Sequence, residues 1–181
     1  MEIREIAQGS AEMQALEEIN IEAIPENERC SLQDMAATGA SVFCIDADRE
    51  PAGFMAVRKY RNLVYLAYFA VRNDLRGRGI GGEAVQALTA SHPDRQVIVE
   101  YEAPDPGCEN NAMRIRRKQF YIRNGFHETG WHTCYDGTEF EVASSRTDFD
   151  PDLFREFAEE LAKIVPDYIP NPFRKGTEPG N

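Results

Sequence analysis

The sequence predicts an α+β fold in which about seven strands are interspersed with helices. Residues 63–71 form an unbroken apolar run, which predicts a strand that is buried on both faces and therefore central in a sheet. A glycine-rich turn and a helix follow at once, since apolar residues recur at four-residue spacing from Ile80 to Leu88. The dipeptide Asp136-Gly137, between two β-prone segments, then indicates a hairpin.

The elements of the N-terminal third are predicted from periodicity and from residues that cap helices. Ser10 and Ser31 can each accept hydrogen bonds from the first turn of a helix. Pro25 ends the first of these helices, and Gly39 closes the second. Strands are expected on either side of this helical pair, over residues 1–6, 41–46 and 53–60.

Similar signals predict the elements after residue 91. Pro93 ends the helix that follows the glycine-rich turn, and Asn124-Gly125 ends another that begins near Asn110. Asp150-Pro151 begins a last helix, and the prolines after residue 165 predict an extended arm or disorder. Strands are expected over residues 96–102, 126–135 and 139–143, and the apolar face of the last helix is expected to hold Leu153, Phe157, Leu161 and Ile164.

Composition restricts the kind of partner. The 181 residues carry a formal net charge of −11, which argues against nonspecific binding to nucleic acid and against docking on an anionic membrane. The longest apolar run is about half of what spans a bilayer, and the N-terminus lacks a signal-peptide pattern. We therefore expect a cytoplasmic protein. No metal site is expected, because these cysteines are widely spaced: Cys30, Cys44, Cys108 and Cys134.

The turn over residues 76–82 has the properties of a phosphate-binding site. Its glycines allow backbone N–H groups to point toward one anion, and Arg76 and Arg78 add positive charge. The N-terminus of the following helix adds a favourable dipole. The turn also satisfies G-x-G-x-x-G, with Glu100 and Glu102 about 20 positions on, so a dinucleotide is an alternative ligand. Against a dinucleotide-binding fold, several strands precede the turn instead of one.

Two motifs together resemble the GNAT family of N-acetyltransferases. Residues 76–81, Arg-Gly-Arg-Gly-Ile-Gly, are similar to the family signature Arg/Gln-x-x-Gly-x-Gly/Ala at a strand-to-helix turn. Residues 121–126, Tyr-Ile-Arg-Asn-Gly-Phe, are similar to the family's Tyr-x-x-x-Gly-Phe, where a helix ends and a strand begins. The resemblance implies a mixed, mostly antiparallel central sheet flanked by helices over residues 1–145. Residues 146–181 lie outside it and form a C-terminal helix with a proline-rich extension.

The resemblance implies that the chain uses acetyl-CoA as a co-substrate. The pantetheine arm would pair with the end of the strand over residues 63–71, and the turn would hold the pyrophosphate. Tyr121 would stand near the sulfur, and the loop with Glu26, Glu28 and Arg29 would border the acceptor site. The cofactor-binding residues implied are Phe69, Ala70, Val71, Arg76, Gly77, Arg78, Gly79, Ile80, Gly81 and Gly82.

Acetyl transfer to an amine requires an acceptor for the amine proton and benefits from a proton donor for the thiolate. Tyr121 suits the donor role, because a phenol with a pKa of about 10 can protonate a thiolate; the alternative is a core aromatic. Glu100 and Glu102 share one strand face, where either could accept the amine proton or bind a cation; the alternative is a solvated strand end. The expected reaction is direct attack by a primary amine of a small molecule.

The helix over residues 110–123 departs from the family pattern, because Arg114 and Arg117 stand where Asn and Ala are common. These arginines could meet CoA phosphates or an anionic part of the substrate, or they could pair with acidic neighbours. Two rival functions remain at this stage: a non-catalytic acyl-CoA-binding protein and a dinucleotide-dependent oxidoreductase. The C-terminal helix and extension also offer contacts for a homodimer.

Overall fold

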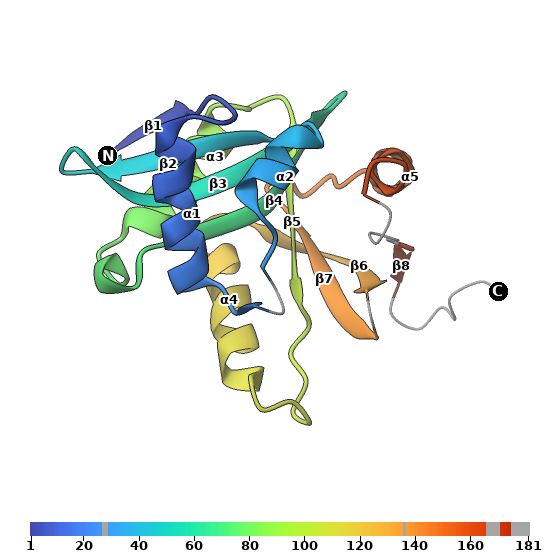
Figure 1. The fold of residues 1–181 in the computed structure, drawn as a ribbon. Coiled ribbons are helices and arrows are strands. Elements are labelled where there is room, and N and C mark those ends of the chain that lie inside the picture. Colours follow the sequence, from blue (N-terminus) through green and yellow to red (C-terminus); the bar gives the residue numbers. More distant parts are fainter. Residues whose placement is uncertain (27–28, 136, 166–170, 175–181) are drawn as a thin grey trace. The chain divides into compact units, whose positions relative to one another are not determined.

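The structure of the protein is a computed structural model that describes residues 1–26, 29–135, 137–165 and 171–174 (Figure 1). It confirms the predicted α+β class, with a mixed, mostly antiparallel sheet flanked by helices. The chain divides into two compact units. The first is formed by Met1–Lys59 with Val64–Ser91, and the second by Tyr60–Leu63 with the described residues from His92 onward.

The first unit contains strands in the order β1-β2-β3-β4. Strand β1 pairs antiparallel with β2, and β2 pairs antiparallel with β3. The turn between β2 and β3 has two residues, Asp48 and Arg49, which both adopt positive φ, so β3 begins three residues before its predicted start. The elements of this unit are β1 (Glu2–Glu5), α1 (Ala11–Ala23), α2 (Leu32–Ala37), β2 (Ser41–Ala47), β3 (Glu50–Tyr60), β4 (Leu63–Val71), the 3₁₀ turn η2 (Asn73–Leu75) and α3 (Ile80–Ala90).

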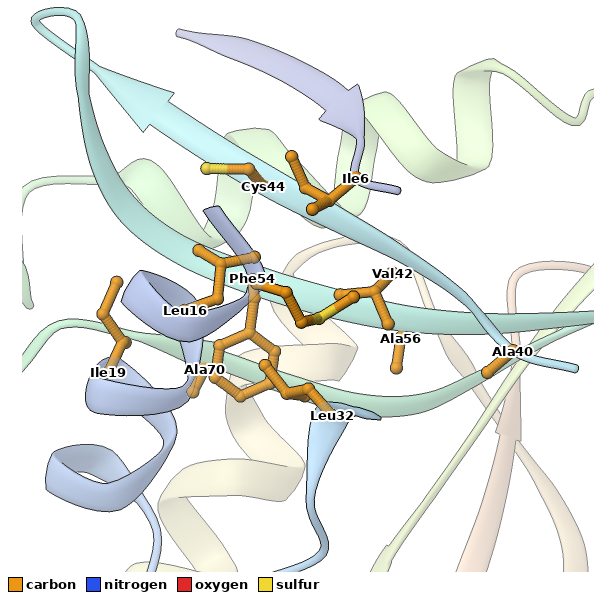
Figure 2. Packing of buried hydrophobic residues seen from close by; sticks show 11 residues of the cluster. Ile6, Leu16, Ile19, Leu32, Ala40, Val42, Cys44, Phe54, Ala56 and Ala70 are labelled. Atoms are coloured by element: carbon orange, nitrogen blue, oxygen red, sulfur yellow. The ribbon is translucent and has the colours of Figure 1, made fainter. Parts of the chain in front are cut away.

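The core of the first unit forms where α1 covers β2 and β3 (Figure 2). The predicted caps hold both helices, since the hydroxyls of Ser10 and Ser31 accept hydrogen bonds from the third residue of α1 and of α2. Leu16 of α1 and Phe54 of β3 are almost fully buried. Each such side chain stabilises the fold by about 1.5–3 kcal/mol relative to exposure.

The second unit contains antiparallel strands in the order β5-β7-β6-β8. The predicted hairpin joins β6 to β7, with Tyr135 opposite Thr138; Asp136 itself lies outside the described residues. The prolines of the predicted arm at positions 166 and 170 also lie outside them. The elements of this unit are β5 (Gln96–Glu102), α4 (Asn111–Arg123), β6 (His127–Tyr135), β7 (Thr138–Ser144), α5 (Pro151–Ala162) and β8 (Phe173–Arg174).

Helix α5 begins as predicted, because the Asp150 carboxylate accepts hydrogen bonds from the N–H groups of Asp152 and Leu153. The predicted apolar face was wrong in part. Ile164 lies beyond the helix and its side chain is exposed, while Leu153 is only half-buried. The buried stripe follows the i, i+3, i+4, i+7 pattern of a helix instead, with Phe154, Phe157, Ala158 and Leu161. No helix in the described residues has the length and apolar character that crossing a membrane requires.

Strands β3 and β4 approach each other closely at one glycine. A Cβ atom built on Gly53 would lie 2.4 Å from the carbonyl oxygen of Ala70 and 3.1 Å from the Cα of Val71. Both contacts are to backbone, so an added methyl group cannot be accommodated by a side-chain rotation. The glycine therefore sets the path of β4 at the residues that are expected to pair with pantetheine.

We expect Gly53→Ala to destabilise the protein by about 1–3 kcal/mol, as overpacking does in a close-packed interior. Binding of CoA should weaken as well, because the end of β4 must move. Chemical unfolding and calorimetric titration with CoA measure the two effects. Gly107→Ala is the matched control, since its nearest neighbour is the Asp105 side chain, which can rotate away. An unchanged unfolding midpoint in Gly53→Ala would contradict this view of β4.

Candidate cofactor turn and catalytic residues

The cofactor turn, residues 76–82, joins β4 to α3 through two left-handed glycines. Gly77 has φ +81° and Gly79 has φ +89°. No atom outside their chain neighbours would crowd a Cβ at Gly77, and at Gly79 the nearest would be Glu83 Oε1 at 3.9 Å. The two glycines are thus required by backbone conformation and not by lack of space.

The N-terminus of α3 is left without a side-chain cap. Gly79 is the N-cap residue, and the first helical hydrogen bond runs from the Glu83 N–H to its carbonyl oxygen. The N–H groups of the helix's first residues, Ile80, Gly81 and Gly82, precede that bond and have no partner within the helix. Oriented N–H groups at a helix N-terminus form a binding site for a phosphate group.

The two arginines of the turn lie differently. Arg76 donates from Nε to the Val71 carbonyl at 3.3 Å and from Nη2 to the Ala23 carbonyl at 3.4 Å. These bonds use two of the five N–H groups of a guanidinium, so the side chain retains donors for an anion. Arg78 is exposed to solvent. The turn therefore carries one arginine anchored to α1 and one directed outward.

The remaining predicted cofactor residues form the end of β4. Ala70 is buried, and Phe69 and Val71 are half-buried. The Arg72 N–H donates to the Ala52 carbonyl at 2.9 Å, so β3 still holds the chain just after β4 ends.

In the second unit, the end of α4 fixes the position of Tyr121. The Phe126 N–H donates to the Tyr121 carbonyl at 3.1 Å, and the Gly125 N–H donates to the Ile122 carbonyl at 3.2 Å. With Gly125 at φ +91°, this pair of bonds is a Schellman motif. The hydrophobic contact typical of that motif is present too, since the Tyr121 and Phe126 rings lie 5.5 Å apart. The Tyr-x-x-x-Gly-Phe pattern is thus a helix-stop signal that also holds a tyrosine.

The Tyr121 ring is packed among aromatic side chains. It stacks on Tyr101 of β5, with ring centroids 5.6 Å apart and ring planes 9° apart. Only 8 % of the residue is exposed. Burial raises the pKa of Tyr121 to about 12, while the positive charge of Arg117 acts in the opposite direction. The phenol is protonated throughout the neutral range, as it would be at the ordinary pKa of about 10, and the raised pKa makes it a weaker acid than a solvated tyrosine.

The two candidate carboxylates of β5 have different partners. Glu100 accepts a hydrogen bond from the hydroxyl of Thr133, a residue of β6 that is 3 % exposed. Glu102 forms an ion pair with Arg114 at 3.0 Å and a second with Arg117 at 3.4 Å. The two carboxylates face Val142 and Phe140 of β7, which agrees with the predicted common face.

The pairing of Arg114 and Arg117 with Glu102 answers the question that the sequence left open. Arg114 is 8 % exposed and also donates to Asn110 Oδ1 at 2.8 Å and to the Ala103 carbonyl at 3.2 Å. One guanidinium thus joins β5, the following loop and the start of α4. Of the two alternatives, pairing with acidic neighbours is confirmed for both arginines, although Arg114 is buried rather than solvated.

Sequence reasoning missed three residues that support these groups. Tyr101 was recognisable only as the residue between two glutamates, on the opposite face of the strand. Thr133 and Asn73 carry no local signal, because their partners Glu100 and Glu22 lie 33 and 51 residues away. In the loop after α1, which the resemblance places beside the acceptor, Arg29 donates to the carbonyl of Ile21 in α1 and to that of its C-cap residue Ile24. Glu28 lies outside the described residues.

The glycine-rich turn after β4 and Tyr121 at the end of α4 are the two motifs that resemble the GNAT family in the sequence. A family model described as the acetyltransferase (GNAT) domain matches residues 38–128 of the 181. The chain therefore belongs to the GNAT family, and it is an acetyl-CoA-dependent acetyltransferase. This assignment removes both rival functions, the non-catalytic binding protein and the oxidoreductase.

Solved structures share the fold at low sequence identity. A protein of Bacteroides thetaiotaomicron assigned to the GNAT acetyltransferases has a TM-score of 0.71 and 22% identity, covering 91% of this chain and 98% of that one. A GNAT acetyltransferase of Elizabethkingia anophelis with acetyl-CoA bound has a TM-score of 0.58 and 13% identity, covering 79% and 95%. The ribosomal-protein-S18-alanine N-acetyltransferase of Escherichia coli has a TM-score of 0.58 and 16% identity, covering 79% and 91%. No curated protein matches the sequence.

We expect Arg114→Met to destabilise the protein by about 3–5 kcal/mol, because it leaves the Glu102 carboxylate partly buried beside Arg117 alone. Arg116→Met on the exposed face of α4 is the control and should change stability by less than about 0.5 kcal/mol. Urea unfolding followed by far-UV circular dichroism measures both. Equal midpoints for the two variants would show that the Glu102 pairs contribute nothing.

Proposed function

We propose that the protein transfers the acetyl group of acetyl-CoA to a primary amine of a small molecule by direct attack in a ternary complex. The observation that carries this proposal is Tyr121, a buried phenol that stays protonated and is held in a helix-stop motif. No cysteine lies in either motif, which favours direct attack over a covalent acetyl-enzyme.

The proposed cofactor site follows the path from β4 into α3. Backbone groups of Phe69, Ala70 and Val71 pair with the pantetheine arm. The N–H groups over residues 76–82 hold the pyrophosphate, supported by the left-handed glycines and by the uncapped start of α3. Arg78, exposed beside the turn, adds positive charge to the same anion.

In the proposed reaction the amine nitrogen attacks the thioester carbonyl carbon, forming a C–N bond, and the C–S bond then breaks. Tyr121 gives its proton to the departing thiolate. The proton lost by the amine passes to Glu100, directly or through a water. We assign Glu100 this role, because Glu102 is engaged by two arginines and acts as the anchor of α4.

The acceptor is proposed to be a small cationic molecule. The support is electrostatic, since a chain with a net charge of −11 attracts cations and repels anions. A turnover screen over a panel of amines, with release of free CoA thiol as the signal, tests the proposal directly. Polyamines, amino acids, aminoglycosides and peptides with free N-termini form its four arms. Turnover confined to the peptide arm would overturn the assignment of a small molecule.

Replacing Tyr121 by Phe removes the proton donor and keeps the aromatic packing. With the amine found in the screen, we expect kcat to fall about 100-fold or more, as for loss of a general acid. Affinity for CoA should change less than about twofold, which calorimetric titration checks. Tyr135→Phe is the control, because Tyr135 is 43% exposed on β6. If Tyr121→Phe keeps full turnover, the thiolate is protonated by another group.

Replacing each glutamate of β5 by glutamine distinguishes the role of Glu100 from that of Glu102. Glu100→Gln should lower kcat by about 100-fold with little change in stability, because it removes the proton acceptor and keeps the side-chain shape. Glu102→Gln should mainly lower the unfolding midpoint, because it weakens the pairs with Arg114 and Arg117. Steady-state kinetics and thermal melting distinguish the two patterns. The opposite assignment of kinetic and stability effects would transfer the acceptor role to Glu102.

A further inference from the structure

The C-terminal end of α1 is held by side chains from outside the helix. The last four carbonyl groups of a helix lack partners within it. Here the Glu22 carbonyl accepts from Asn73 Nδ2 at 3.2 Å, and the Ala23 carbonyl accepts from Arg76 Nη2 at 3.4 Å. Both donors come from the segment between β4 and α3, about 50 residues away in the sequence. We call the two bonds the α1 clamp.

A third donor satisfies the carbonyls on either side of the clamp. Arg29, in the loop between α1 and α2, donates from Nη1 to the Ile21 carbonyl at 3.3 Å and to the Ile24 carbonyl at 3.4 Å. Four successive carbonyls, from Ile21 to Ile24, therefore accept hydrogen bonds from side chains. Two of these bonds belong to the loop and two belong to the segment that carries the cofactor turn.

The end of the loop that leads into α2 forms hydrogen bonds with β4 and with α1. The Cys30 N–H donates to the Tyr68 hydroxyl of β4 at 3.0 Å, and the Cys30 carbonyl accepts from Asn20 Nδ2 at 2.9 Å. Asn20 is fully buried in α1. The Tyr68 and Asn20 contacts fix the second end of the loop independently of the clamp. The first end, which leaves α1, depends on the clamp and on Arg29.

We propose that Asn73 and Arg76 are positioning residues that couple binding of the CoA pyrophosphate to the position of the C-terminal end of α1 and of residues 24–26, which follow it. The inference rests on the proposed function, in which the cofactor turn holds the pyrophosphate, and on the family resemblance, which implies that the loop after α1 borders the acceptor. Arg76 can take part in both contacts at once, because its bonds to Val71 and Ala23 leave three of its five N–H groups for a phosphate.

The expected direction of the coupling follows from the groups that Arg76 joins. Its guanidinium donates to the last turn of α1 and keeps other N–H groups for an anion. A bound pyrophosphate fixes the guanidinium of Arg76 and the backbone of the turn. The clamp then tightens, and the last turn of α1 frays less. A ligand that orders a segment lowers the entropy loss of the next ligand that uses it, which is positive cooperativity.

Hydrogen–deuterium exchange tests the coupling without knowledge of the acceptor. In the wild-type protein, saturating CoA should slow exchange of the amides over residues 21–26 by about fivefold or more, as for a coupling of about 1 kcal/mol. Pantetheine, which lacks the pyrophosphate, should leave these amides unchanged. Unchanged exchange with CoA, at a concentration where calorimetry shows saturation, overturns the proposal and leaves the proposed function standing. A protein that binds no CoA overturns both.

Asn73→Ala separates the clamp from the cofactor site, because Asn73 lies outside the turn. We expect the variant to bind CoA at most about fivefold more weakly than wild type, because the coupling is reciprocal, and to lose most of the CoA-dependent protection in α1. Asp74→Asn is the matched control, since Asp74 lies in the same 3₁₀ turn but contacts Arg72. Full protection in Asn73→Ala overturns the role of Asn73. If Asn73→Ala does not fold, the comparison of CoA with pantetheine on the wild-type protein still decides the proposal.

Discussion

The unpaired hydrogen-bonding groups at helix ends are the constraint on which this structure depends. Every helix leaves N–H groups at one end and carbonyl groups at the other without internal partners. At the start of α3 the N–H groups have no side-chain cap, because a glycine, Gly79, is the N-cap residue. At the end of α4 the carbonyls are closed by Gly125 and Phe126, which fixes Tyr121. At the end of α1, carbonyls accept hydrogen bonds from Arg76 of the cofactor turn and from Asn73 just before it.

The ion pairs of Glu102 show how an acidic chain can accommodate a buried arginine. The buried guanidinium of Arg114 contacts three acceptors, which are the Glu102 carboxylate, an amide oxygen and a backbone carbonyl. A buried pair of this kind adds less net stability than its geometry suggests, because both ions lose hydration. Its contribution here is to fix α4 against β5, and with α4 the ring stack of Tyr121 on Tyr101.

The sequence reveals what is encoded locally. The left-handed turn and the helix stop are visible because only glycine adopts their φ values readily, so Gly77, Gly79 and Gly125 mark both sites. Two of the four residues predicted for the apolar face of α5, Phe157 and Leu161, are buried, while Leu153 and Ile164 were wrong, since several registers of its leucines and phenylalanines fit a helical period. The hydrogen bond from Asn73 to the Glu22 carbonyl could not be predicted from the sequence, because every residue supplies a backbone carbonyl and the two residues lie 51 positions apart. The carboxylates were predicted by residue type, but their partners, Thr133 of β6 for Glu100 and two arginines of α4 for Glu102, depend on tertiary packing.

The two C-terminal elements α5 and β8 both contact an intrinsic fluorophore in β6. Trp131 of β6 is the only tryptophan of the chain. Two guanidinium groups lie over its ring, that of Arg155 of α5 at 4.9 Å from the centroid and that of Arg174 of β8 at 5.7 Å. Both contacts are cation–π interactions, and both come from residues beyond the span of the family model. The fluorescence emission of Trp131 is therefore expected to change when α5 or β8 loses its contact with β6, and no added dye is needed to measure it.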